Sequence, residues 1–163
     1  MTSEDLAERG LVLLGCGKMG SAMLQGWLTD GLPATSVHVI DPYPSDWLQA
    51  QGVHINAELP AAPAIVLIAV KPQMMGDALP AIKAMATGNS LFVSVAAGVT
   101  LATYEEMLGA DNPIIRAMPN TPAAVGRGIT ALIGNRKVSE AQMVLAESLL
   151  QAVGQTVRLD NEG

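Results

Sequence analysis

The chain has 163 residues, half of them hydrophobic, and carries a formal net charge of −6. This length and hydrophobic content suit one domain with a buried core and argue against intrinsic disorder. The acidic balance, with no cluster of Lys and Arg, argues against a nucleic-acid partner, because phosphate neutralisation needs a basic footprint.

Three further features predict a cytoplasmic protein with no membrane partner. Cys16 is the only cysteine, so neither an internal disulfide nor a cysteine-based zinc site is expected, which is typical of a reducing compartment. The first ten residues, MTSEDLAERG, are acidic and polar, unlike a secretory signal. The longest apolar run, residues 64–70, is far too short to span a bilayer.

The first half of the chain predicts strands that alternate with helices. Leu11–Leu14 is apolar at consecutive positions, as expected of a strand covered on both faces. Lys18–Thr29 then changes to a helical period. Further strands are expected at 37–40, 53–55 and 65–70, with helices at 45–51 and 73–86, the second of them bent or split by Gly76 and Pro80.

The second half continues the alternation. Strands are expected at 90–95, 113–118, 128–133 and 156–159, helices at 100–108 and 139–153, and a turn and a loop at 58–62 and 123–128. Thr100 and Ser139 are the expected N-caps of the two helices. Alternation with short connections predicts an α/β fold of the Rossmann type: a doubly wound, mostly parallel sheet with helices on both faces.

Three glycines between the first predicted strand and helix indicate a dinucleotide site. Gly15, Gly17 and Gly20 form the pattern G-x-G-x-x-G. Gly15 allows a tight turn, Gly17 leaves room for a pyrophosphate, and Gly20 lets the helix pack close to the sheet. The N-terminus of that helix then attracts a phosphate. A tight turn without a ligand, or a site for S-adenosylmethionine, remains the alternative.

Asp41 is the clue to which dinucleotide binds. It lies 21 residues after Gly20, at the end of the second predicted strand. A carboxylate there can accept hydrogen bonds from the adenosine ribose and would repel a 2′-phosphate, which favours NADH. The equal alternative is that Asp41 only begins a turn before Pro42.

Three later strands are expected to end beside the glycines. Their ends carry I-A-V-K-P-Q at 68–73, S-V-A-A-G at 94–98 and R-A-M-P-N-T-P at 116–122. In an open α/β sheet the ligand crevice lies outside the carboxyl ends of the strands, so all three segments should line it. Small residues leave room for a flat nicotinamide ring, and prolines fix the backbone.

Taken in order, these segments resemble pyrroline-5-carboxylate reductase over nearly the whole chain. The matching elements are G-C-G-K-M-G, N-A-E at 56–58, V-K-P-Q, S-V-A-A-G, R-A-M-P-N-T-P and V-G at 125–126. The resemblance implies hydride transfer from NAD(P)H to 1-pyrroline-5-carboxylate, a small-molecule substrate, giving L-proline in proline biosynthesis. It implies NADPH as the usual cofactor, whereas Asp41 favours NADH. No catalytic acid or base is singled out, since the cofactor supplies the hydride.

The resemblance also assigns the cofactor contacts. The pyrophosphate is held by Gly15, Gly17, Lys18, Met19 and Gly20. The adenosine ribose or its phosphate is reached by Asn56. The length of the cofactor is lined by Ala69, Val70, Lys71 and Pro72, and its nicotinamide end by Ala96, Ala97, Gly98, Met118, Pro119 and Asn120.

The family continues into a helical domain that begins with S-G-S-G-P-A, contacts the substrate carboxylate and forms the homo-oligomer. Residues 1–163 are therefore expected to be the NAD(P)-binding domain without that part. As a separate chain they should bind the cofactor, turn over poorly, stay monomeric and expose some apolar surface. Two alternatives are a non-catalytic dinucleotide-binding regulatory module and another reductase of the same superfamily, acting on a deazaflavin or a hydroxyacid.

Overall fold

The computed structural model describes residues 6, 8–57, 59–60, 62–96, 98–109, 111–119 and 128–159. The strands are β1 (Leu11–Leu14), β2 (Val37–Ile40), β3 (His54–Ile55), β4 (Ile65–Ile68), β5 (Leu91–Ser94), β6 (Ile114–Pro119), β7 (Gly128–Gly134) and β8 (Gly154–Arg158). The helices are α2 (Lys18–Thr29), α3 (Asp46–Gln49), α4 (Met75–Ala78), α5 (Pro80–Lys83), α6 (Leu101–Leu108) and α7 (Glu140–Leu150), with 3-10 turns η1 (Ala34–Ser36), η2 (Pro72–Met74) and η4 (Gln151–Val153).

The described residues form one sheet of eight strands in the order β3-β2-β1-β4-β5-β6-β7-β8. The six strands from β3 to β6 are parallel, β7 is antiparallel to β6, and β8 is parallel to β7. The order reverses at β1, which has β2 on one side and β4 on the other. The expected Rossmann-type fold is confirmed, and its ligand crevice should lie at this reversal.

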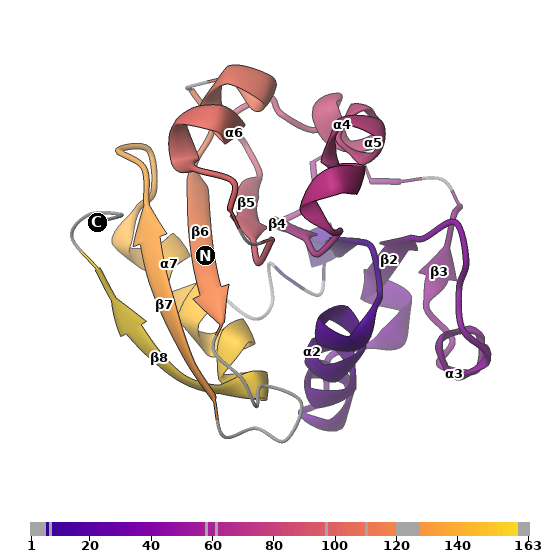
Figure 1. Cartoon of the computed structure of the whole chain (residues 1–163). Helices are drawn as coiled ribbons and strands as arrows, with labels where there is room; N and C mark the ends of the chain where they lie inside the picture. The colour runs from indigo at the N-terminus through magenta and orange to yellow at the C-terminus, as the bar shows by residue number, and fades with distance from the viewer. Residues whose placement is uncertain are drawn as a thin grey trace.

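Helices cover both faces of the sheet (Figure 1). The α2 and α7 face packs on Leu11 and Leu13 of β1, whereas the face of α4, α5 and α6 packs on Val12 and Leu14. Successive residues of a strand point to opposite faces, so a strand buried on both sides is apolar at every position. This is why β1 and β4 could be predicted from short apolar runs.

Local capping fixes where the helices begin. The Ser139 side chain accepts from Gln142 N–H, and the Gln142 side chain accepts in return from Ser139 N–H, which forms a capping box. Thr100 caps α6 as expected. The predicted helix 73–86 is split into η2, α4 and α5, with the break before Pro80, because proline has no N–H to continue the ladder. Gly76 lies inside α4 and does not break it.

Several other predicted boundaries shift by one to three residues; for example, the strand predicted at 65–70 ends at Ile68. The predicted helix 139–153 ends as an α-helix at Leu150 and continues as η4, and the last strand begins at Gly154 rather than at residue 156. Most of the predicted loop 123–128 lies outside the described residues, because only Gly128 is described, as the first residue of β7. Residues 58 and 61 of the predicted turn also lie outside them.

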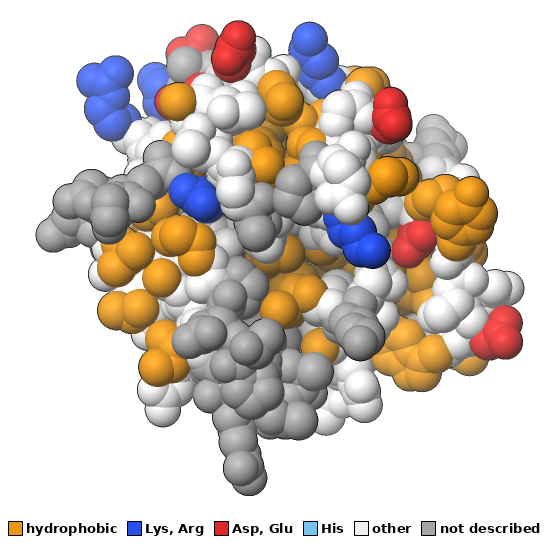
Figure 2. All heavy atoms as spheres, in the orientation of Figure 1, with side chains coloured by type: hydrophobic (Ala, Val, Ile, Leu, Met, Phe, Trp, Pro, Cys, Tyr) orange, Lys and Arg blue, Asp and Glu red, His pale blue; other side chains and the backbone are white. Residues whose placement is uncertain are grey.

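One face of the β7–β8 end of the sheet is not covered by a helix among the described residues. Ile129, Val157 and Leu159 are 49%, 45% and 37% exposed. Figure 2 shows hydrophobic side chains gathered over these two strands, on the left of the view. The chain thus has exposed apolar surface of the kind that the sequence predicted. Within the described residues, every helix is too short or too polar to cross a bilayer.

Candidate functional site

The turn after β1 is tied to the strands on both sides. Gly15 N–H donates to Ile40 O at 2.7 Å, and Ala69 N–H donates to Leu14 O at 2.8 Å. Gly15 has a φ of +84°, and a Cβ there would lie 2.8 Å from Val70 Cγ1. The fold itself therefore requires glycine at position 15.

The other two glycines of the motif differ from each other. A Cβ on Gly20 would lie 3.0 Å from the Gly15 carbonyl oxygen, so the close approach of α2 to the turn favours glycine there. Gly17 has an ordinary φ of −78°. Apart from Gly17 and its two neighbours in the chain, no described residue has a heavy atom within 4 Å of the position that a Cβ on Gly17 would take. Glycine suits a helix N-cap better than alanine does, but nothing in the described part of the fold crowds position 17, and the bare backbone faces open space.

The N-terminus of α2 lies at this bare position. Its N-cap is Gly17, which provides no side-chain cap, and its first turn holds no acidic residue. The first N–H groups of a helix lack partners within the helix and carry the positive end of its dipole. The arrangement suits an anion that approaches over Gly17.

Asp41 joins the end of β2 to the glycine turn. Cys16 N–H donates to Asp41 Oδ2 at 3.0 Å, and Tyr43 N–H donates to Asp41 Oδ1 at 2.9 Å. The second bond is an Asx-turn, so the turn-forming role considered for Asp41 is present in the structure. The carboxylate is thus held between two main-chain donors.

Asn56 holds the backbone of the same residue. Its Nδ2 donates to Asp41 O at 2.7 Å, and its Oδ1 accepts from Asp41 N–H at 2.9 Å. Asn56 has a φ of +51°, a left-handed conformation that Asn tolerates better than most residues. Most of its amide is therefore engaged by Asp41, with one N–H left for a ligand.

A cavity of about 700 Å³ opens between these segments, at the point where the strand order reverses. This volume is in the range of small-molecule and cofactor sites. Its lining residues are Leu14, Gly15, Cys16, Gly17, Ile40, Asp41, Pro42, Tyr43, Asn56, Ala69, Val70, Lys71, Met74, Asp77 and Ala78. The structure thus brings together the predicted residues of four segments: the glycine turn, the ends of β2 and β3, and the segment after β4.

Sequence reasoning missed part of the cavity wall. Met74, Asp77 and Ala78 lie on η2 and α4, and Tyr43 is 88% exposed at the rim. A helical pattern beginning at residue 73 could have suggested that its first turn faces the crevice. The direction of that turn depends on how Pro72 leaves the sheet, which no local pattern gives.

Of the remaining predicted residues, those whose side chains the structure describes do not line this cavity. Ala96 and Gly98 follow β5, and Met118 and Pro119 end β6, at the same carboxyl edge but farther along the sheet. Met19 and Gly20 lie in the first turn of α2. The side chains of Lys18, Pro72 and Pro119 lie outside the described part of the chain, as do Ala97 and Asn120 altogether.

A buried pair fixes the end of β5. The hydroxyls of Ser94 and Tyr104 share a hydrogen bond, and Ser94 Oγ accepts from Ala96 N–H at 3.1 Å. Tyr104 is fully buried, and this burial raises the pKa of its phenol. Burial also raises the pKa of the Cys16 thiol, and the charge of Asp41 acts in the same direction. Both groups therefore stay protonated near neutral pH and have structural roles here.

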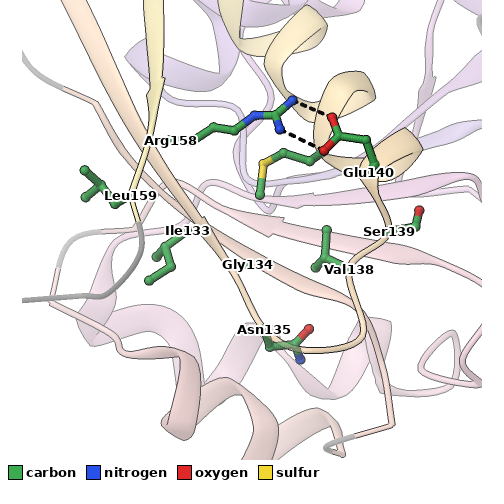
Figure 3. Close-up of a pocket in the computed structure, with 9 residues that line it drawn as sticks. Ile133, Gly134, Asn135, Val138, Ser139, Glu140, Arg158 and Leu159 are labelled. Carbon is green, nitrogen blue, oxygen red and sulfur yellow. Dashed lines mark hydrogen bonds and ion pairs between the residues drawn. The ribbon is translucent and has the colours of Figure 1, made fainter.

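A second hollow, of about 320 Å³, lies between the end of β7, the start of α7 and Arg158 (Figure 3). The Arg158 guanidinium donates to both oxygens of Glu140, at 2.9 and 2.8 Å, and to Glu147 at 2.7 Å. Arg158 lowers the pKa of the Glu140 carboxyl. Its charge is engaged by these two carboxylates, and none of the predicted site residues lies here.

The segment that contains the glycine turn matches a known protein family. A family model described as "NADP oxidoreductase coenzyme F420-dependent" matches residues 10–98, more than half of the chain. The chain belongs to this family. The part that matches the NADP oxidoreductase model runs from the residue before β1 to Gly98, and contains the whole lining of the larger cavity.

Curated relatives bear the name that the motifs suggested. Pyrroline-5-carboxylate reductase of Pseudomonas aeruginosa is 35% identical over 158 residues, which cover 93% of this chain and 58% of the relative. The Escherichia coli enzyme is 38% identical over 140 residues, 81% of this chain and 52% of the relative. The resemblance to pyrroline-5-carboxylate reductase is confirmed. The chain spans little more than half the length of these relatives.

Solved structures agree with the NADP oxidoreductase assignment. A pyrroline-5-carboxylate reductase from Coxiella burnetii has a TM-score of 0.87 and 30% identity, over 94% of this chain and 60% of that one. A Plasmodium falciparum pyrroline carboxylate reductase with NADP bound has a TM-score of 0.81 and 25% identity, over 94% and 58%.

Proposed function

We propose that this chain binds NAD(P)H in the cavity at the ends of β1, β2 and β4, as the cofactor-binding part of an enzyme that reduces 1-pyrroline-5-carboxylate to L-proline. Gly17 carries the proposal. Crowding by neighbouring atoms explains the glycines at 15 and 20. Position 17 is not crowded: it faces open space at the N-terminus of α2, which no side chain caps. A pyrophosphate lying over that backbone supplies the missing reason for glycine.

The rest of the cofactor follows from the position of the pyrophosphate. The adenosine lies toward Asp41 and Asn56, between the apolar walls made by Ile40 and Met74. The nicotinamide extends the other way, toward the ends of β5 and β6. Ala96 and Gly98, which follow β5, and Met118 in β6 are proposed to contact it, and the family resemblance adds Ala97, Pro119 and Asn120.

The bound cofactor would supply a hydride to the imine carbon, and the protein's task is to bind and orient the two reactants. Asp41, Asn56 and the α2 N-terminus anchor the end of the cofactor that does not react. The Ser94–Tyr104 pair fixes the main chain at Ala96, where the reactive ring is proposed to lie. We assign no catalytic proton donor.

We propose further that these 163 residues bind the cofactor without completing the reaction. The matched part of the Pseudomonas aeruginosa relative is 58% of its length, and the remainder is the proposed source of the substrate contacts. On this proposal the separate chain is monomeric and acts in the cytoplasm. Steady proline formation by the purified chain would contradict the proposal that the substrate contacts come from the part of the relatives that this chain does not match.

The experiment compares two glycine-to-alanine variants by titration with NADH and NADPH, followed by nicotinamide fluorescence. Gly17→Ala should weaken binding by about tenfold or more, because a methyl group occupies the pyrophosphate path. Gly76→Ala is the matched control, because its Cβ also enters open space but outside the cavity lining. Unchanged binding by Gly17→Ala, or no binding by the unmodified chain, would overturn the proposal.

A further inference from the structure

We infer that the adenosine end of the cavity selects a dinucleotide with an unphosphorylated ribose, so that this chain binds NADH in preference to NADPH. The inference rests on the proposed function and specifies its ligand. It depends on how Asp41 is held, which the sequence alone does not show.

The Asp41 carboxylate cannot turn aside at low cost. Its two oxygens accept from the N–H groups of Cys16 and Tyr43, which belong to different segments. Rotation of the side chain would break both bonds and leave main-chain donors of the turn without their partner. Each oxygen still has a free lone pair directed to other donors, so the fixed carboxylate can accept from the 2′- and 3′-hydroxyls of a ribose.

The main chain of Asp41 is held as firmly as its side chain. The two hydrogen bonds from the Asn56 amide fix both polar groups of the Asp41 backbone. The bond between Gly15 N–H and Ile40 O ties the preceding residue to the glycine turn. The site therefore cannot admit a 2′-phosphate by a small shift of the loop after β2.

The charges around Asp41 are equally unfavourable to a phosphate. Among the described lining residues, Asp41 and Asp77 are acidic, Lys71 is the one basic residue, and none is arginine. Lys71 follows β4, which is two strands away from β2 in the sheet, roughly 10 Å at the usual strand spacing. A ribose 2′-phosphate would thus lie against a fixed carboxylate, with the nearest described lining cation on the far side of the glycine turn.

The test titrates the unmodified chain and two variants with NADH and NADPH in parallel. The unmodified chain should bind NADH at least about tenfold more tightly, as expected for one like-charge contact avoided at a partly screened site. Asp41→Asn should shift the ratio of the two dissociation constants toward NADPH by about tenfold. Asp77→Asn removes the same charge from the part of the lining that α4 provides, and should change the ratio by less than about threefold.

A second measurement on the unmodified chain does not depend on the variants folding. Raising the salt from about 0.05 to about 0.5 M should tighten NADPH binding relative to NADH, because screening weakens repulsion between Asp41 and the phosphate. If a cation held the 2′-phosphate, the same rise in salt would weaken NADPH binding relative to NADH.

The outcomes separate the inference from the proposed function. Equal or tighter binding of NADPH, or a ratio that Asp41→Asn leaves unchanged, would overturn the inference while the proposed function stands. Failure of both nucleotides to bind would overturn the proposed function itself.

Discussion

Two glycines in the same turn should differ in how much stability the chain loses when each is replaced by alanine. Gly15→Ala places a side chain at a φ of +84°, which costs about 1–2 kcal/mol for an L-residue. Its Cβ would also lie 2.8 Å from Val70 Cγ1 and 3.1 Å from Ala69 O, and relief of such overpacking typically costs about 1–3 kcal/mol. We therefore expect the free energy of unfolding to fall by about 2–5 kcal/mol. Gly17→Ala has neither penalty. Alanine is a poorer helix N-cap than glycine, so the free energy of unfolding should fall by no more than about 1 kcal/mol.

Urea unfolding followed by tryptophan fluorescence measures both variants, since Trp27 is buried against the core and reports its loss. The slope of the transition should be unchanged, so that the midpoint alone carries the difference. A Gly15→Ala variant as stable as the unmodified chain would refute the reasoning about the turn. Equal destabilisation by Gly17→Ala would show that glycine at 17 serves the fold, and would remove the argument for a ligand.

Two further predictions concern stability elsewhere in the chain. Ser139→Ala removes the capping box with Gln142 and should cost about 1 kcal/mol, seen as a lower urea midpoint; no loss would mean that the helix start is held by packing alone. Burial lowers the pKa of His38, and the charge of His54 acts in the same direction. The unfolded chain therefore binds the proton more readily, so stability present above the ordinary histidine value near 6.5 should be lost as pH falls below it. The melting temperature should drop less between about pH 7.5 and 5.5 in His38→Gln than in the unmodified chain, and equal drops would contradict the assignment.

Local sequence was enough for the parts of the fold that depend on neighbouring residues. The bounds of β1 and α2 follow from an apolar run, a glycine turn and a helical period, and the structure has the same bounds. Ser139 and Thr100 were recognisable as N-caps because capping involves a residue only three positions away.

Features that depend on register were not predictable in this way. His38 and His54, separated by fifteen residues, suggested no contact, yet the parallel pairing of β2 and β3 places them side by side with ring centroids 4.6 Å apart. The contact between Ser94 and Tyr104 likewise depends on how α6 lies over the sheet. Neither pair leaves a periodic signal in the sequence.

In the candidate site, too, local motifs were predictable from the sequence, whereas contacts that depend on how the strands align were not. The motif predicted that Gly15, Gly17 and Gly20 would meet the end of β2, and the family resemblance added Asn56. The bond from Cys16 N–H to the Asp41 carboxylate was not foreseen, because it depends on the relative height of two strand ends. That bond makes Asp41 both a support of the turn and a fixed charge at the place proposed for the ribose.

The most direct test of the central claim is a map of amide chemical-shift changes as NADH is added to the isotopically labelled chain. The account predicts changes at residues 15–20, 41, 43, 56, 69–71, 73 and 74, in the turn and the cavity around it, because these amides contact or adjoin the bound dinucleotide. It predicts no comparable changes in the hollow beside Arg158, which involves residues 133–143. Changes centred on that hollow, or saturating NADH that leaves the amides of residues 15–20 unmoved, would contradict it.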